Sequence, residues 1–192
     1  GADAENYLRS LLGLLQDGFF SQERNLHYWP AGYPILIWMV GFFAQGSTLA
    51  MIAILQSVLY FIACAFFVDE IRQSRLVNFS IPIALILTLN PTLSLNTIAI
   101  GYELPTASLA LIAIAAMMRQ FRKSSKSIFT LDLLVASISM SLATFMQPRL
   151  ILFAILLFGI WALAKYPRKS AAAFLSVSML VVLLAPAVMI YR

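Results

Sequence analysis

Cysteine, histidine and recognisable catalytic motifs are scarce in this 192-residue sequence, and each scarcity excludes a kind of site. The single cysteine, Cys64, excludes an intrachain disulfide and a cysteine-cluster metal site, and its apolar neighbours predict a small buried side chain. The single histidine, His27, has no histidine or cysteine near it in sequence. There is no glycine-rich phosphate loop, Ser/His/Asp nucleophile order or HExxH motif. We therefore expect no resident metal and no organic cofactor.

Charge is also scarce. Charged residues make up 11% of the chain, whereas a soluble domain has about 25%. Hydrophobic residues make up 61%, and the mean hydropathy is +0.89. A single core of this size cannot bury so much apolar surface, but a bilayer can solvate it. The composition predicts an integral membrane protein with membrane lipid around it. The net charge of +5 then reports topology, and no nucleic-acid partner is expected.

Uncharged runs predict an all-α, polytopic bundle of six transmembrane helices. A spanning helix needs about 20 apolar residues, within a range of about 17–25. Shorter runs reach that length through flanking Arg and Lys side chains that extend to the interface. Asn90-Pro91 falls inside the second run and predicts a kink there. The six runs are Ser47–Val68, Val77–Tyr102, Leu104–Met118, Leu133–Pro148, Leu150–Ala164 and Ser170–Tyr191.

Two further helices are expected to lie on the membrane surface. Residues 4–16 carry leucines at helical spacing, which predicts an amphipathic interfacial helix; these are Leu8, Leu11, Leu12 and Leu15. Ile35–Gln45 is apolar, but only Gln45-Gly46 separates it from the next run. Because two antiparallel spans need a longer turn, we interpret residues 1–46 as an extracytoplasmic loop. Residues 47–192 would form the six-span region, and the chain would be a fragment of a longer protein.

The basic residues give the orientation. With six spans, nine of the thirteen Lys and Arg residues lie in loops 69–76, 119–130 and 165–169, so this side is interpreted as cytoplasmic. If Ile35–Gln45 crosses as a seventh span, the split becomes eleven to two, which charge alone mildly favours. We prefer six spans because of the short turn, and because six spans gather acids and isolated arginines on the outer face. The basic loops themselves are interpreted as topology signals only.

Each charged residue on this outer face has a structural explanation beside a functional one. Asp3 suits a helix N-cap, Glu5 favours a helix N-terminus, and Glu103 suits the membrane edge, but all three also suit proton transfer. Arg149 stands in the short turn Gln147-Pro148-Arg149, where snorkelling and anion binding explain it equally well. Arg192 shares the outer face on this topology.

The segment "HYWPAGYP" at residues 27–34 joins the two surface helices. Its tyrosines and tryptophan suit an aromatic belt at the lipid headgroups, and its prolines restrict the backbone. Aromatic rings also suit the apolar faces of sugars. We therefore interpret this segment as a rigid outer hinge that holds the loop carrying Asp3.

The stretches "GADAENYLRSLLGLLQDGFFSQ" and "YWPAGYPILIWMVGFFAQG" resemble the first outer loop of type C membrane glycosyltransferases. The similarity is to the protein-mannosyltransferase and aminoarabinose-transferase families. Weaker similarities are "NP" at 90–91, "YELP" at 102–105 and the closing "APAVMIYR", where Pro186-Ala187 replaces the usual Pro-Trp. The resemblance implies sugar transfer from a polyprenyl-phosphate-linked donor to a lipid or protein acceptor. It implies an extracytoplasmic active face, in a bacterial cytoplasmic (inner) membrane.

The resemblance also implies residue roles. Asp3 would be the catalytic acid/base, Glu103 a second acid, and Arg149 and Arg192 ligands of the donor phosphate. Together with the outer-face grouping this gives candidate catalytic residues Asp3, Glu5 and Glu103, and candidate substrate-binding residues Tyr28, Trp29, Tyr33, Tyr102, Gln147, Arg149 and Arg192. Asp3 and Glu5 could also hold a divalent cation, although two acids do not require one.

Two alternatives to an enzyme stay open. A transporter or lipid flippase fragment would line a path across the bilayer with charges, and the predicted spans contain almost none at mid-depth. A non-catalytic membrane subunit would tolerate substitution of every outer-face residue.

Overall fold

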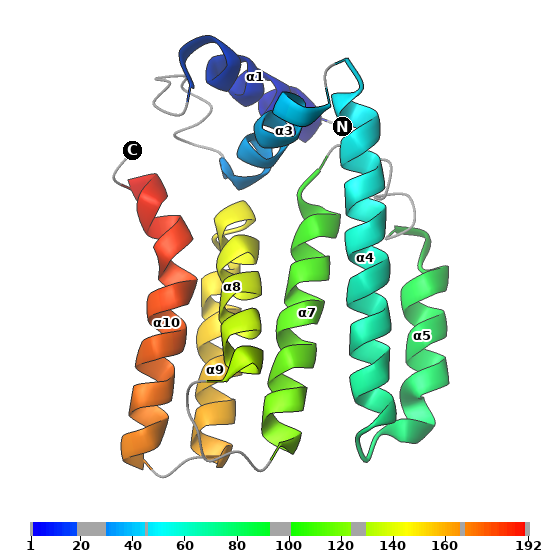
Figure 1. The fold of residues 1–192 in the computed structure, drawn as a ribbon, viewed down its shortest axis with the longest axis vertical. Helices are drawn as coiled ribbons and strands as arrows, with labels where there is room; N and C mark the ends of the chain where they lie inside the picture. The colour runs from blue at the N-terminus through cyan, green and yellow to red at the C-terminus, as the bar shows by residue number, and fades with distance from the viewer. Residues whose placement is uncertain are drawn as a thin grey trace.

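The computed structural model describes residues 2–18, 30–44, 46–92, 101–123, 130–165 and 168–190, and in these ranges the chain is all-α, as predicted (Figure 1). Within these ranges, six helices run side by side as a bundle, and two lie across one end of it, which we call the capped end (Figure 1). The capping helices are α1 (Ala2–Asp17) and α3 (Gly32–Phe43). The bundle helices are α4 (Thr48–Arg72), α5 (Ser80–Leu89), α7 (Glu103–Arg122), α8 (Leu131–Met146), α9 (Leu150–Lys165) and α10 (Arg168–Ile190), and a 3-10 turn, η2 (Val77–Phe79), precedes α5.

Small side chains let the bundle helices pack closely. The α7 helix packs against α4 and α8, and α10 packs against α8 and α9. Alanines are fully buried along these contacts, among them Ala113, Ala136 and Ala154. Larger side chains, including Met140 and Phe158, fill the remaining space. Small residues at helix contacts allow the close backbone approach that is typical of helices in membranes.

The bundle is apolar outside and holds hydroxyl groups inside. Large apolar side chains face outward, such as Phe61 and Leu152, each 73% exposed. Buried hydroxyls include those of Ser108 and Thr144, which donate to the carbonyls of Leu104 and Ser141 in their own helices at 2.8 and 2.9 Å. A soluble bundle would show the opposite distribution, so this surface suits a lipid environment.

Helix length does not support all six predicted spans. In the described ranges, only Thr48–Arg72 and Glu103–Arg122 are both long and apolar enough to cross a bilayer, and more than half of the second helix's most apolar stretch is buried inside the protein. Each of the other predicted spans contains a helix whose apolar part, counted over the described residues alone, has 10–17 residues. A helix is therefore confirmed in each of the six predicted spans, whereas the crossing of the membrane by all six remains a proposal.

The second predicted span is interrupted at Asn90. The sequence predicted a kinked helix over Val77–Tyr102, but α5 ends at Leu89. Asn90 has extended backbone with ψ 112, as the residue before Pro91 tends to have. Its side-chain oxygen accepts a hydrogen bond from the Thr92 backbone N–H at 3.0 Å. The helix is thus interrupted at the Asn-Pro pair, where we predicted a kink, and Pro91 and Thr92 are again helical; residues 93–100 of the predicted span lie outside the described residues.

The two capping helices pack with faces that periodicity alone did not identify. Most of the predicted leucine stripe of α1 points outward, with Leu12 and Leu15 55% and 63% exposed, while Leu11 is half-buried. The buried face of α1 instead carries Tyr7, Ser10 and Leu14. A tight turn at Gly46, whose positive φ of 78° suits glycine, then leads into α4. As predicted, α3 does not run alongside α4 but lies across the bundle end (Figure 1).

Candidate functional site

Three tyrosines from separate elements meet at the capped end. Tyr7 comes from α1, Tyr33 from the first turn of α3, and Tyr102 from the residue before α7. The Tyr7 ring meets the Tyr33 ring edge-on at a centroid distance of 5.4 Å, and the Tyr102 ring at 5.8 Å. Edge-to-face pairs at such distances stabilise a contact beyond simple burial. We call these residues the tyrosine cluster; it fixes α1 and α3 to the start of α7.

The Tyr33 hydroxyl is held as a hydrogen-bond donor. The side chain is fully buried, and its hydroxyl donates to Gln56 Oε1 at 2.8 Å. Burial raises the pKa of Tyr33 to about 12; a backbone hydrogen bond from Gly101 opposes this rise, and the Glu103 carboxylate adds to it. At neutral pH Tyr33 therefore stays protonated, so it can position a neighbour or a ligand but cannot act as a base.

Glu103 is an accessible carboxylate beside this cluster. It is the first residue of α7 and is exposed. A helix N-terminus favours a negatively charged side chain at this position. Its side chain folds back over Gly101, where an added Cβ would collide with the Glu103 carboxylate. The structure thus brings together three predicted site residues: Tyr33, Tyr102 and Glu103.

The acids of α1 are placed differently from each other. Asp3 lies in the first turn of α1, one helical turn before Tyr7, so its backbone is at the capped end; its side chain lies outside the described residues. Glu5 forms an exposed ion pair with Arg9 at 2.6 Å, apart from the tyrosine cluster. Among the described residues, no group of three or more His, Cys, Asp or Glu side chains is suited to hold a metal.

Gln147 and Arg149 also lie at the capped end. They form the turn between α8 and α9, next to the point where α3 touches α8. Arg149 is exposed and has no ion pair within the part of the chain that the structure describes, so its guanidinium is open to an anion. The other predicted substrate-binding residues, Tyr28, Trp29 and Arg192, lie outside the described residues.

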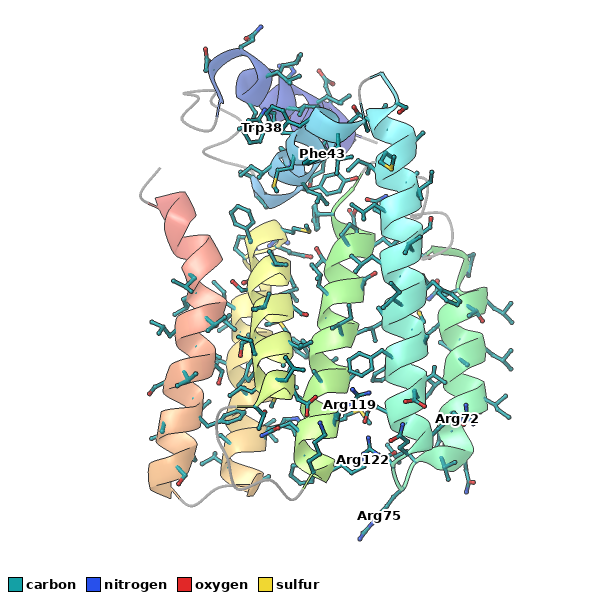
Figure 2. The ribbon with its side chains drawn as sticks, viewed as in Figure 1. Trp38, Phe43, Arg72, Arg75, Arg119 and Arg122 are labelled. Atoms are coloured by element: carbon teal, nitrogen blue, oxygen red, sulfur yellow. The ribbon has the colours of Figure 1, made fainter. Side chains whose placement is uncertain are left out.

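An apolar groove of about 570 Å³ adjoins the capped end. Its walls come from α1, α3 and the start of α4, and include Leu8, Leu15, Trp38 and Phe42. Leu8, Leu11 and Leu15 of the predicted stripe, together with Leu14, form the wall that α1 contributes. Beyond the groove the end of α3 is strongly apolar, with Phe43 90% exposed (Figure 2). This surface is suited to hydrocarbon chains.

The opposite end of the bundle holds an ion-pair cluster that the sequence analysis missed. The Glu70 side chain is fully buried, and its two oxygens accept from Arg119 Nε at 2.6 Å and Arg122 Nη2 at 2.7 Å. Arg119 also lies 4.5 Å from the centroid of the Phe66 ring. We predicted only topology signals here, but the structure shows an organised cluster between α4 and α7 (Figure 2). The available signals were an acid at the end of an apolar run and two arginines three residues apart.

The chain matches no protein-family model, no curated protein and no solved structure. The resemblance to type C glycosyltransferases therefore stays a prediction from the residues quoted above.

Proposed function

We propose that this chain is part of a membrane glycosyltransferase that moves a sugar from a polyprenyl-phosphate donor to an acceptor on the extracytoplasmic face. One observation carries the proposal. The capped end brings an accessible carboxylate, Glu103, next to a cluster of tyrosine rings, and α1 places Asp3 one turn from that cluster. Carboxylates beside aromatic rings can bind a sugar and move a proton.

The surface of the bundle supports a place in the membrane. Its outward side chains are apolar, and its six helices lie roughly parallel (Figure 1). We propose that all six cross the bilayer, with the capped end outside. At 1.5 Å per residue a helix of 16 residues spans about 24 Å, so α8 and α9 cross only where the bilayer thins or flanking residues extend to the interface. The α5 helix, with 10 residues, spans about 15 Å and depends most on its flanking residues.

The chemistry needs a base, a leaving group and positive charge. In the proposed reaction a carboxylate, Asp3 with Glu103 nearby, accepts the proton of the acceptor hydroxyl or amine. The acceptor atom forms a bond to the anomeric carbon of the sugar, and the bond from that carbon to the phosphate oxygen breaks. The lipid phosphate leaves with the bonding electrons, and Arg149, with Arg192, stabilises its charge.

The remaining parts of the capped end suit the donor. Tyr102, the partly exposed ring of the tyrosine cluster, would contact the apolar face of the sugar, while the buried rings of Tyr7 and Tyr33 hold it in place. The groove between α1 and α3 offers an apolar channel for the start of the polyprenyl chain. The Tyr33–Gln56 hydrogen bond holds the ring cluster in place against α4.

Transfer of labelled sugar by the full-length protein tests the proposal. Asp3→Asn should lower the transfer rate about 10²–10⁴-fold, with donor binding largely kept, because Asn cannot accept the proton. Asn caps a helix about as well as Asp, so the fold should survive. Asp17→Asn, at the other end of α1, is the matched control and should transfer normally. Normal transfer by well-expressed Asp3→Asn would show that Asp3 only caps the helix, and would defeat the proposed role.

A further inference from the structure

A second cavity, of about 550 Å³, lies at the end of the bundle opposite the cap. One wall is the turn after α4, which contributes Gln73, Ser74 and Arg75. The other wall comes from α7 and α9 and contributes Met118, Phe121 and Trp161. Phe121 and Trp161 stack edge-on at 5.0 Å between ring centroids. The cavity is therefore polar on one side and aromatic on the other.

The charge at this cavity is positive. Arg75, Arg122 and Glu70 line the cavity, which leaves an excess of one positive charge, and Glu70 is paired with Arg119 as well as with Arg122. Arg122 bonds to Glu70 and to Gln73, which engages two of its five N–H donors and holds it at the cavity wall. Asp69, the nearest other acid on α4, is bound by the Gln73 amide at 2.6 Å.

The surroundings of the cavity are those of a membrane interface. Leu76, Val77 and Phe79 follow Arg75 and are about half exposed. Arg119 and Arg122 lie between α4 and α7, while Arg75 extends beyond the end of the bundle (Figure 2). A ligand here would meet positive charge at its outer part and aromatic side chains at its inner part. A phospholipid with a net negative headgroup has this arrangement of charge and hydrocarbon.

We propose that this cavity binds the phosphate group of an anionic phospholipid, with Arg75 and Arg122 as its cationic ligands and the Phe121–Trp161 wall against the first carbons of the acyl chains. The inference requires that the bundle lies in a bilayer, but it does not require sugar transfer. Its test therefore fails or succeeds independently of the catalytic proposal.

Trp161 reports directly on occupancy of this cavity. In the full-length protein, Trp29→Phe, Trp38→Phe and replacement of any tryptophan outside this sequence leave Trp161 as the fluorophore. This variant is placed in nanodiscs that contain phospholipid brominated near the top of its acyl chains. Bromine quenches a tryptophan that it contacts, so quenching measures the relative binding of each lipid. We expect brominated phosphatidylglycerol to bind about tenfold better than brominated phosphatidylcholine. The control variant keeps Trp38, at the capped end, and replaces Trp161. The two brominated lipids should quench the fluorescence of Trp38 equally.

Arginine variants separate a site from general surface charge. Arg75→Gln should lower the preference for phosphatidylglycerol about fivefold. Arg72→Gln is the matched control, because Arg72 is exposed, lies three residues away and is not among the cavity-lining residues; it should keep the preference within about twofold. Thermal unfolding of both variants checks that they fold. Arg122 is unsuitable as the main test because it also pairs with Glu70.

Three results would overturn the proposal. Equal quenching of Trp161 by the two lipids would show that the cavity does not prefer an anionic phospholipid. Equal loss in Arg72→Gln and Arg75→Gln would show a diffuse surface effect. Loss of the preference in 10 mM inorganic phosphate, with no loss in chloride of the same ionic strength, would show that the cavity takes free phosphate and not a lipid headgroup.

Discussion

Replacement of Gly32 by alanine should loosen the capping helices from the bundle. Gly32 begins α3 and faces the backbone at the end of α8. An added Cβ would lie 2.6 Å from the Phe145 carbonyl oxygen, 2.7 Å from its carbon and 2.8 Å from the Met146 nitrogen. All three atoms are backbone atoms, so no side chain can rotate away. Either α3 or the end of α8 must shift.

The size of the effect follows from this geometry. To restore an ordinary contact the two backbones must separate by roughly 0.5–1 Å, and overpacking of this kind costs about 1–3 kcal/mol. For a protein of this size about 2 kcal/mol lowers Tm by about 4–8 °C. A shift on this scale at the sugar site should also lower transfer by up to about 10²-fold, because the site depends on precise placement.

Gly41 supplies the control within the same helix. A Cβ there would meet only the Thr48 side chain, at 3.7 and 3.8 Å, which is ordinary contact. Gly41→Ala should be neutral or should raise stability by up to about 1 kcal/mol through helix propensity. Thermal unfolding in detergent and hydrogen exchange of the α3 amides measure both variants. If Gly32→Ala is as stable as Gly41→Ala and exchanges no faster, the close approach of α3 to α8 is not what holds the cap.

Two further predictions concern the opposite end and the topology. Glu70→Gln should lower the free energy of unfolding by about 1–3 kcal/mol. This is less than for a fully buried pair, because the side chains of Arg119 and Arg122 are 34% and 39% exposed. In thermal unfolding, the double variant with Arg122→Gln should lose less stability than the sum of the two single variants, and strict additivity would refute the pairing. In a Cys64→Ala background with any other cysteine of the full-length protein replaced, single cysteines at Gln16 and Asn78 should label from opposite sides of the membrane with an impermeant reagent; labelling from one side would exclude six crossings.

Local sequence signals were enough to predict the helices and to separate α1 and α3 from the bundle helices. The short turn at Gln45-Gly46 before the next run indicated that α3 could not cross back alongside α4. Leucine spacing located α1, but not the face that packs: Tyr7 is buried, while Leu12 and Leu15 are exposed. Periodicity shows that a helix has two faces, and only its partners decide which one is covered.

Contacts between distant residues could not be predicted. Glu70 pairs with Arg119 and Arg122 across 49 and 52 positions, and Tyr33 bonds to Gln56 across 23. These pairings depend on how α4 packs against α7 and α3, which no local pattern specifies. Glu103 could be predicted as a site residue, because an acid between apolar runs is costly in a membrane. Its position beside Tyr33, however, depends on how α1 and α3 pack on the bundle.

Photo-crosslinking of the donor tests the central claim most directly, because it locates the sugar. The full-length protein in nanodiscs would receive a polyprenyl-phosphate sugar that carries a diazirine on the sugar ring, and cross-linked peptides would be mapped by mass spectrometry. We predict crosslinks in residues 30–36 and 101–104, around Tyr33, Tyr102 and Glu103, that unlabelled donor competes away. Competed crosslinks confined to the opposite end, in residues 69–76 or 119–123, would contradict the assignment of the capped end as the sugar site.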